Sequence, residues 1–212
     1  MAGSSLAAST RVGVLALQGD FREHIAVLES LGADAIGVRR PAELAEVDGL
    51  VIPGGESSVM DKLSRMFGLA EPLKAAIASG LPVWGTCAGL IMLADTVLDG
   101  IEGQQSLGGL DIAVRRNAFG SQLDSFETDL AIPVVGEPAL HAVFIRAPIV
   151  ESVSAGVSTL ASLSDGRVVA VEQGNLLGTS FHPEMTGDRR FHEYFLSKVA
   201  ARRVSGCGGW RP

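Results

Sequence analysis

The sequence predicts an α/β protein of three layers, in which a mixed, mostly parallel central sheet is flanked by helices. Two patterns support this fold class. In the first half of the chain, short aliphatic runs alternate with helical patterns, as in parallel sheets whose strands are connected by helices. In the second half, short strand patterns follow one another with turn signals between them, and we expect these strands to extend the sheet in antiparallel fashion.

Four buried strands are expected in the first half, at residues 11–17, 34–40, 49–55 and 81–86. Each is a short run of mostly apolar residues, which is typical of a strand covered on both faces. The first helix is expected to begin after Asp20, because Asp20 and Glu23 have the spacing of a capping box. It is expected to end at Gly32.

Further helices are expected at 58–80, at 88–94 and at about 188–203. The first of these should break near Gly68 and Pro72, which are poor helix formers. Strands of the second half are expected at 107–116, 125–132, 141–150, 156–163, 166–173 and 175–181. The glycine-rich stretch 99–111 is expected to be a surface loop.

Composition limits the class of protein. Apolar residues make up 47% of the chain and no linker is visible, so residues 1–212 are expected to form one domain with disordered ends at 1–10 and 204–212. The net charge of −7 argues against nucleic acid as a ligand. No apolar run is long enough for a membrane span and no signal peptide is recognisable, so we expect a soluble, cytoplasmic protein. The two cysteines, Cys87 and Cys207, suggest neither a disulfide framework nor a zinc site, and no cofactor or metal is expected.

The stretch from Gly85 to Gly89, GTCAG, has the spacing of a nucleophile elbow between a strand and a helix. A sharp turn would strain the backbone of Cys87, and the flanking glycines would let strand and helix approach closely. The helix N-terminus favours the thiolate over the thiol, and the Ala88 N–H is placed to bind an oxyanion. On this stretch alone, a nucleophile and a small buried core cysteine fit equally well.

A thiol nucleophile needs a base, and His182 is the best placed of the four histidines because it follows a predicted strand. Glu184 lies two residues further on, so an extended backbone would put both side chains on one side, as suits a base and its orienting carboxylate. The same pair is also compatible with a metal site, and single histidines are more commonly surface or capping residues. His24 and His192 lie in predicted helices beside charged residues, and His141 begins a strand.

The stretch VIPGGESSVM, residues 51–60, leads from a strand through Gly54 and Gly55 into a helix. Glycines at this point let the backbone turn and present N–H groups to a developing oxyanion. Alone, the motif is also compatible with an ordinary strand–helix loop. Together with the cysteine elbow and the His–Glu strand end, in this chain order, it favours a cysteine-dependent active site.

Six blocks resemble the class I (triad) glutamine amidotransferases and, among them, the glutaminase subunits of pyridoxal 5'-phosphate synthase, the PdxT family. They are LALQGDFREH (15–24), PGGESS (53–58), GTCAGLI (85–91), RRNAFGSQLDSFE (115–127), FIRAP (144–148) and SFHPE (180–184). The resemblance covers about residues 11–200 and is loose at 99–111. It implies the class I glutamine amidotransferase-like, flavodoxin-like form of the α/β fold.

The resemblance also implies an activity. The enzyme would hydrolyse L-glutamine to L-glutamate and ammonia and deliver the ammonia to a synthase partner, PdxS, which makes pyridoxal 5'-phosphate. In that family, twelve glutaminase subunits decorate a core of twelve synthase subunits. Carried over by motif, Cys87 is the nucleophile, His182 the general base and acid, and Glu184 the orienting carboxylate.

The remaining roles are carried over in the same way. The oxyanion hole is assigned to Gly55 and Ala88, and Gln18 is a candidate for sensing partner docking. The residues assigned to the glutamine site are Gly55, Glu56, Ser57, Arg116, Ile145 and Arg146.

Other interpretations stay open on the sequence alone. The chain could be a glutaminase serving another synthase, a catalytically silent structural or regulatory subunit, or a cysteine hydrolase acting on peptides or small metabolites. The FIRAP and RRNAFGSQ blocks argue against the first, the intact Cys, His and Glu against the second, and the PGGES and HPE blocks against the third.

Overall fold

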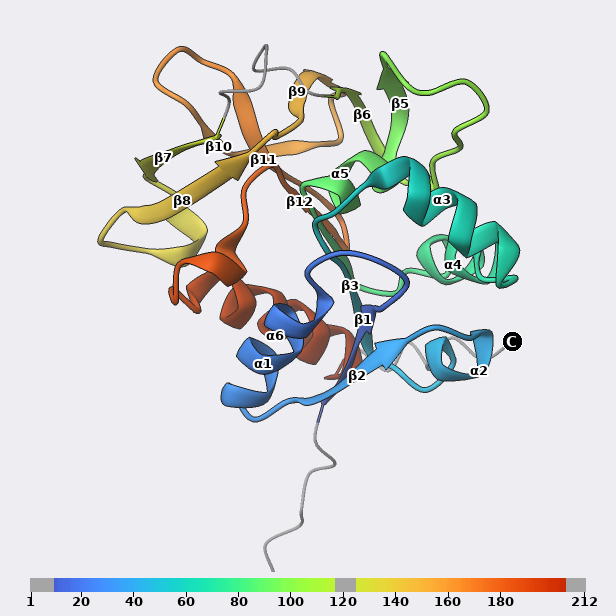
Figure 1. The fold of residues 1–212 in the computed structure, drawn as a ribbon. Helices are drawn as coiled ribbons and strands as arrows, with labels where there is room; N and C mark the ends of the chain where they lie inside the picture. Colours follow the sequence, from blue (N-terminus) through green and yellow to red (C-terminus); the bar gives the residue numbers. More distant parts are fainter. Residues whose placement is uncertain (1–9, 117–124, 205–212) are drawn as a thin grey trace, which may run out of the picture.

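The computed structural model describes residues 10–116 and 125–204. A large mixed sheet lies between two groups of helices, and a small two-stranded sheet stands beside it (Figure 1). The three-layer α/β class expected from the sequence is confirmed. Nearly all of both predicted tails, Cys207 and much of the block 115–127 lie outside the described residues, although Val204 is the last residue of a helix.

Within residues 10–116 and 125–204, the large sheet has ten strands, which are β1 (Arg11–Leu15), β2 (Asp34–Val38), β3 (Gly49–Ile52), β4 (Val83–Thr86), β5 (Ala94–Leu98), β6 (Leu110–Arg115), β9 (Ile149–Val153), β10 (Ser158–Ser162), β11 (Val168–Gln173) and β12 (Leu176–Thr179). Their order is β2-β1-β3-β4-β12-β11-β9-β6-β5, with β10 beside β11. The first five in this order are parallel, whereas β11 is antiparallel to β12, β9 and β10. The late strand β12 therefore lies next to β4.

The helices are α1 (Phe21–Ser30), α2 (Pro41–Leu44), α3 (Ser57–Met66), α4 (Ala70–Ala78), α5 (Ala88–Leu93) and α6 (Arg190–Val204). Short 3-10 turns occupy η1 (Pro133–Val135) and η2 (Pro183–Met185). Among the described residues, no helix is both long and apolar enough to cross a membrane.

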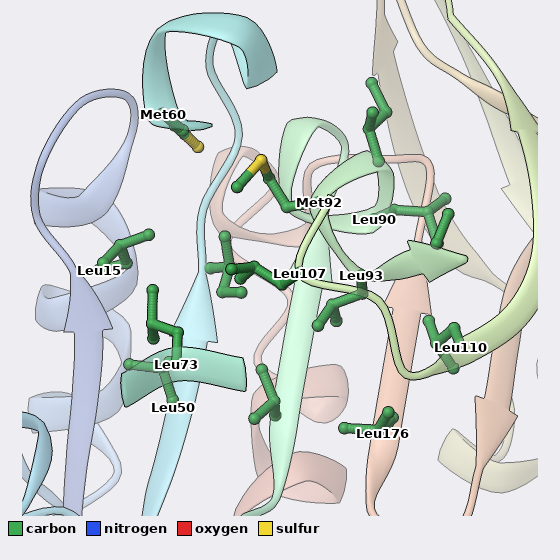
Figure 2. Packing of buried hydrophobic residues seen from close by; sticks show 14 of the residues in the cluster. Leu15, Leu50, Met60, Leu73, Leu90, Met92, Leu93, Leu107, Leu110 and Leu176 are labelled. Atoms are coloured by element: carbon green, nitrogen blue, oxygen red, sulfur yellow. The ribbon is translucent and has the colours of Figure 1, made fainter. Parts of the chain in front are cut away.

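The two faces of the sheet are covered by two separate apolar clusters. On one face, α1 and α6 contribute Leu28, Phe191 and Phe195, which pack with Trp84. On the other face, α2 to α5 pack against residues such as Leu50 of β3 (Figure 2). Full burial of one such leucine or phenylalanine contributes roughly 1.5–3 kcal/mol, so both helix layers are firmly attached to the sheet.

The strands of the second half do not all join the large sheet. Among the described strands, β7 (Ser125–Leu130) and β8 (Leu140–Ile145) pair only with each other, as a separate antiparallel sheet. The run 141–150, expected as one strand, is divided between β8 and β9. At Arg146 the backbone turns sharply, with φ 44°, and Pro148 follows. Residues 94–98 form the edge strand β5, which the sequence did not predict.

Two expectations about helix ends have different outcomes. The break expected within 58–80 occurs at Gly68, where φ is 68°, whereas Pro72 is accommodated in the first turn of α4. The capping box expected at Asp20 is wrong, because its side chain makes no capping hydrogen bond in the described first turn of α1. The Asp20 carboxylate lies instead 3.8 Å from Nδ1 of His182.

Candidate active site

The topology brings three sequence motifs to one edge of the sheet. Gly54, Cys87 and His182 follow β3, β4 and β12, which are adjacent and parallel. Thr86 and Thr179, the last residues of β4 and β12, are in register, so these strands end at the same level. The backbone N–H of Cys87 donates to the Thr179 carbonyl at 2.7 Å, which fixes the turn after β4 against β12.

Cys87 has the backbone geometry expected of an elbow. Its φ of 48° and ψ of −101° are strained for a residue with a side chain. A Cβ on Gly85 would lie 2.4 Å from the backbone of Gly89, and a Cβ on Gly89 would lie 2.0 Å from the Ile52 carbonyl oxygen. Glycine is therefore required on both sides of the turn. The Cys87 residue is 6% exposed, and Sγ lies 3.9 Å from the carbonyl oxygen of Ile145.

His182 and Glu184 form a hydrogen bond of 2.7 Å between Nδ1 and Oε1. They are brought together by the start of the turn η2 rather than by a continuing strand. Burial alone would lower the pKa of His182, but hydrogen bonds with the Cys87 sulfur and with Glu184 outweigh burial and raise this pKa to about 10. At neutral pH the imidazole of His182 is therefore protonated.

The metal interpretation of the His–Glu pair gains one further carboxylate. Ligand atoms of Asp20, His182 and Glu184 all lie within 4.8 Å of one another. However, the 2.7 Å separation between His182 and Glu184 is a hydrogen-bond distance, so a proton already occupies Nδ1, the atom that would have to bind an ion. This geometry favours a base with its carboxylate over a metal pair.

A pocket opens beside the cysteine, lined by Gly55, Glu56, Ser57, Cys87, Ile91, Arg116, Ile145 and Arg146. All six residues assigned to the glutamine site from the sequence lie on its wall. Ile91, from α5, is an addition that the motifs did not indicate. Ala88, assigned to the oxyanion hole, is buried at the start of α5, directly after Cys87.

Arg116 is held in the pocket wall by two neighbours. Its Nη2 donates to Glu56 Oε1 at 2.6 Å, and its Nη1 donates to Gln104 Oε1 at 2.7 Å. Gln104 in turn donates from Nε2 to Ser57 Oγ at 3.0 Å. The stretch 99–111, expected to be only a surface loop, therefore contributes a site residue. No motif signalled Gln104, because its role depends on where the loop folds.

Gln18 connects the loop after β1 to the loop after β3. Its Oε1 accepts a hydrogen bond of 2.8 Å from the backbone N–H of Glu56. Gly55 has φ 148°, and a Cβ there would lie 2.4 Å from the same Gln18 oxygen. The conformation of the Gly54–Gly55 loop thus depends on the Gln18 side chain.

Two histidines of the predicted helices lie behind the site. His24 of α1 and His192 of α6 are fully buried, and His24 Nε2 lies 3.3 Å from Glu184 Oε2. A signal for His24 was present, since it is four residues before Leu28 and thus on the apolar face of α1. The adjacent charged residues concealed that signal.

Comparisons with known proteins identify relatives of the chain. The model of the SNO glutamine amidotransferase family matches residues 14–201. A pyridoxal 5'-phosphate synthase subunit PdxT from Leifsonia xyli subsp. xyli is 73% identical over 93% of this chain and 100% of its own length. One of the same name from Clavibacter sepedonicus is 68% identical over 89% of this chain and 90% of its own length. A crystal structure of a glutamine amidotransferase superimposes with a TM-score of 0.83 at 46% identity, covering 89% of this chain and 98% of the other.

Proposed function

Because the chain belongs to the SNO glutamine amidotransferase family, we propose that it is the glutaminase subunit of a pyridoxal 5'-phosphate synthase. It hydrolyses L-glutamine to L-glutamate and ammonia and passes the ammonia to a synthase subunit. The observation that carries the proposal is the strained Cys87, which lines the pocket and acts on the pKa of His182, itself 2.7 Å from Glu184. The names of relatives at 68% identity and above support the same assignment.

In the proposed reaction, the Cys87 thiolate attacks the side-chain amide carbon of glutamine. The C–N bond of the tetrahedral intermediate then breaks, and the His182 imidazolium gives its proton to the leaving ammonia. Water attacks the resulting glutamyl thioester and loses a proton to the neutral His182; the C–S bond then breaks, which releases glutamate and restores the Cys87 thiolate beside a protonated His182. Glu184 keeps the imidazole oriented and stabilises its protonated form.

The oxyanion of each tetrahedral intermediate is assigned to the backbone N–H groups of Gly55 and Ala88. The α5 N-terminus supports this assignment, because its first N–H groups have no partner within the helix. Arg116 is suited to the α-carboxylate of glutamine, since a guanidinium has five N–H donors and the two contacts above leave others available. Glu56 supplies a carboxylate for the α-ammonium group. Ser57, Ile145 and Arg146 complete the proposed glutamine site.

We propose PdxS as the synthase partner, with twelve glutaminase subunits on a core of twelve synthase subunits, and residues 1–212 of this chain as one glutaminase domain. Gln18 is suited to sense docking, because its side chain holds the backbone N–H next to Gly55. Movement of Gln18 on docking would change the orientation of this peptide and so of the oxyanion hole. A peptide flip at glycine is inexpensive, which makes this loop a plausible switch.

The direct test is ammonia release from L-glutamine by the purified chain, alone and with the synthase partner, with Cys87→Ala as the control. The proposal predicts release that increases with the partner and is lost in the variant, while thermal unfolding is unchanged. A chain that binds the partner but releases no ammonia in any mixture would instead be a structural or regulatory subunit.

A further inference from the structure

Behind the proposed triad lies a pair of buried histidines that the reaction above does not use. Nδ1 of His24 is 2.9 Å from Nε2 of His192, and both residues are fully buried. Both rings stand edge-on to Trp84, with centroids 5.5 and 4.9 Å from the indole ring. The pair is therefore held rigidly between α1, α6 and β4 and has a fixed relation to the site.

The carboxylate oxygen Oε2 of Glu184 lies next to this histidine pair. Oε1 accepts the hydrogen bond from His182, whereas Oε2 has no well-formed hydrogen bond to any residue in 10–116 or 125–204. The Glu184 side chain is fully buried, and His24 Nε2 lies 3.3 Å from Oε2. A buried carboxylate oxygen needs a donor, and an N–H on His24 Nε2 is placed to supply it. The same nitrogen also lies 3.3 Å from Thr86 Oγ1.

The hydrogen bond between the two histidines fixes where their protons are. If His24 carries its proton on Nε2, then its Nδ1 must accept, so His192 donates from Nε2. His192 Nδ1 is then a bare acceptor, and it is the atom of His192 that has no partner among the described residues. The opposite arrangement would bury an unpaired N–H at His192 and aim a lone pair of His24 at the Glu184 carboxylate.

Burial keeps both rings neutral, as this arrangement requires. It lowers the pKa of His24 well below the usual value of 6.5, and the nearby His192 and His182 lower it further. Burial also lowers the pKa of His192 to about 4. Each ring therefore has one N–H and one acceptor at neutral pH.

We propose that His24 is a positioning residue of the active site, which donates from Nε2 to Glu184 Oε2 while His192 fixes its tautomer. The proton chain then runs from His192 through His24 to Glu184, and Glu184 presents Oε1 to His182. With both oxygens engaged, the carboxylate cannot rotate away, and the imidazole keeps its direction toward Cys87. This inference rests on the proposed glutaminase function for its consequence, but not for its geometry.

The matched variants His24→Asn and His24→Gln separate positioning from packing. An asparagine amide reaches about as far as Nδ1, so it can keep the contact with His192 but loses the donor to Glu184. A glutamine amide reaches about as far as Nε2 and can keep that donor. We expect kcat for ammonia release with the synthase partner to fall on the order of tenfold in the first variant, with KM unchanged, and to recover most of this loss in the second.

The pH profile provides a readout that packing alone would not move. Loss of the donor lets the Glu184 carboxylate rotate away from His182, which weakens the hydrogen bond that holds the His182 proton, so the alkaline limb of kcat should move down by about one pH unit in His24→Asn. The titratable groups around His182 and Glu184 are Cys87, Asp20, His24 and His192, and His24→Asn removes His24 alone from this set. Equal kcat losses in both variants, or an alkaline limb that stays or moves up, would overturn the proposal.

A second measurement needs neither variant nor activity. Nitrogen-15 NMR of the folded wild-type chain distinguishes the two neutral tautomers, and we expect Nε2–H for both His24 and His192 at neutral pH. A proton on His24 Nδ1 would refute the proposal even if the glutaminase assay succeeds. If the wild-type chain releases no ammonia with its partner, the proposed function fails, and the NMR result still decides the tautomers.

Discussion

Replacing Gly54 with alanine should damage catalysis and leave the fold intact. The φ of Gly54 lies outside the left-handed region, so its backbone conformation is open to alanine. The added Cβ would lie 2.3 Å from His182 Cε1, 2.9 Å from His182 Nδ1 and 3.1 Å from Asp20 Oδ2. The substitution therefore acts on the imidazole of the proposed base and has no effect through backbone strain.

The size of the effect follows from the overlap. Carbon atoms in ordinary contact are about 3.5 Å apart, so the His182 ring or the loop must move by roughly 1 Å. A misplacement of about 1 Å at a reacting group costs on the order of 100-fold in rate. This corresponds to about 2.7 kcal/mol of transition-state stabilisation. We expect kcat for ammonia release to fall by this factor in Gly54→Ala.

The matched control is Gly100→Ala, because a Cβ there meets nothing closer than 3.7 Å and its φ is also outside the left-handed region. Both variants should bind the synthase partner and unfold within a few degrees of the wild type. The assay is ammonia release from saturating L-glutamine with partner present. Near-normal kcat in Gly54→Ala, or an equal loss in Gly100→Ala, would refute the reasoning from the His182 contact.

Three further predictions concern acid stability and the pocket. The pKa of His192 is about 4 in the native protein and about 6.5 in the unfolded chain. Its contribution to the free energy of unfolding is therefore fully present above pH 6.5 and decreases as the pH falls, by about 3 kcal/mol at pH 4. Urea unfolding at several pH values should show a shallower decrease in His192→Gln. Gln104→Ala removes a hydrogen bond that holds Arg116, so KM for glutamine should rise roughly tenfold with little change in kcat; an unchanged KM would exclude Gln104 from the site. Gln18→Ala frees the Glu56 N–H, so activation by the synthase partner should be lost although binding, measured by sedimentation, persists; full activation would exclude Gln18 as a sensor.

Local motifs were predictable where the backbone itself requires particular residues. Gly85 and Gly89 are needed because any Cβ would collide with the neighbouring backbone, and such a requirement leaves a mark in the sequence. The alternation of strands and helices likewise predicted the parallel part of the sheet. The position of β12 beside β4 depends on long-range pairing, so the sequence indicated His182 as the partner of Cys87 only through its place after a predicted strand and through the family resemblance of its motif.

Features that depend on tertiary packing were missed. His24 and His192 are polar residues in helices with charged neighbours, and their burial follows from how α1 and α6 meet over Trp84. Gln104 lies in a glycine-rich loop whose path no local pattern specifies. β7 and β8 have ordinary strand patterns, which do not distinguish a separate hairpin from strands added to the sheet edge.

The central claim, that Cys87 is the nucleophile of a glutamine-specific site, is tested most directly by covalent labelling. The chain would be treated, with its synthase partner, with a glutamine analogue that carries a diazoketone in place of the side-chain amide, and the site of attachment mapped by peptide mass spectrometry. The account predicts a single adduct on Cys87, prevented by excess L-glutamine and absent in Cys87→Ala. Labelling at Cys207 instead, or an adduct on Cys87 that L-glutamine does not prevent, would contradict it.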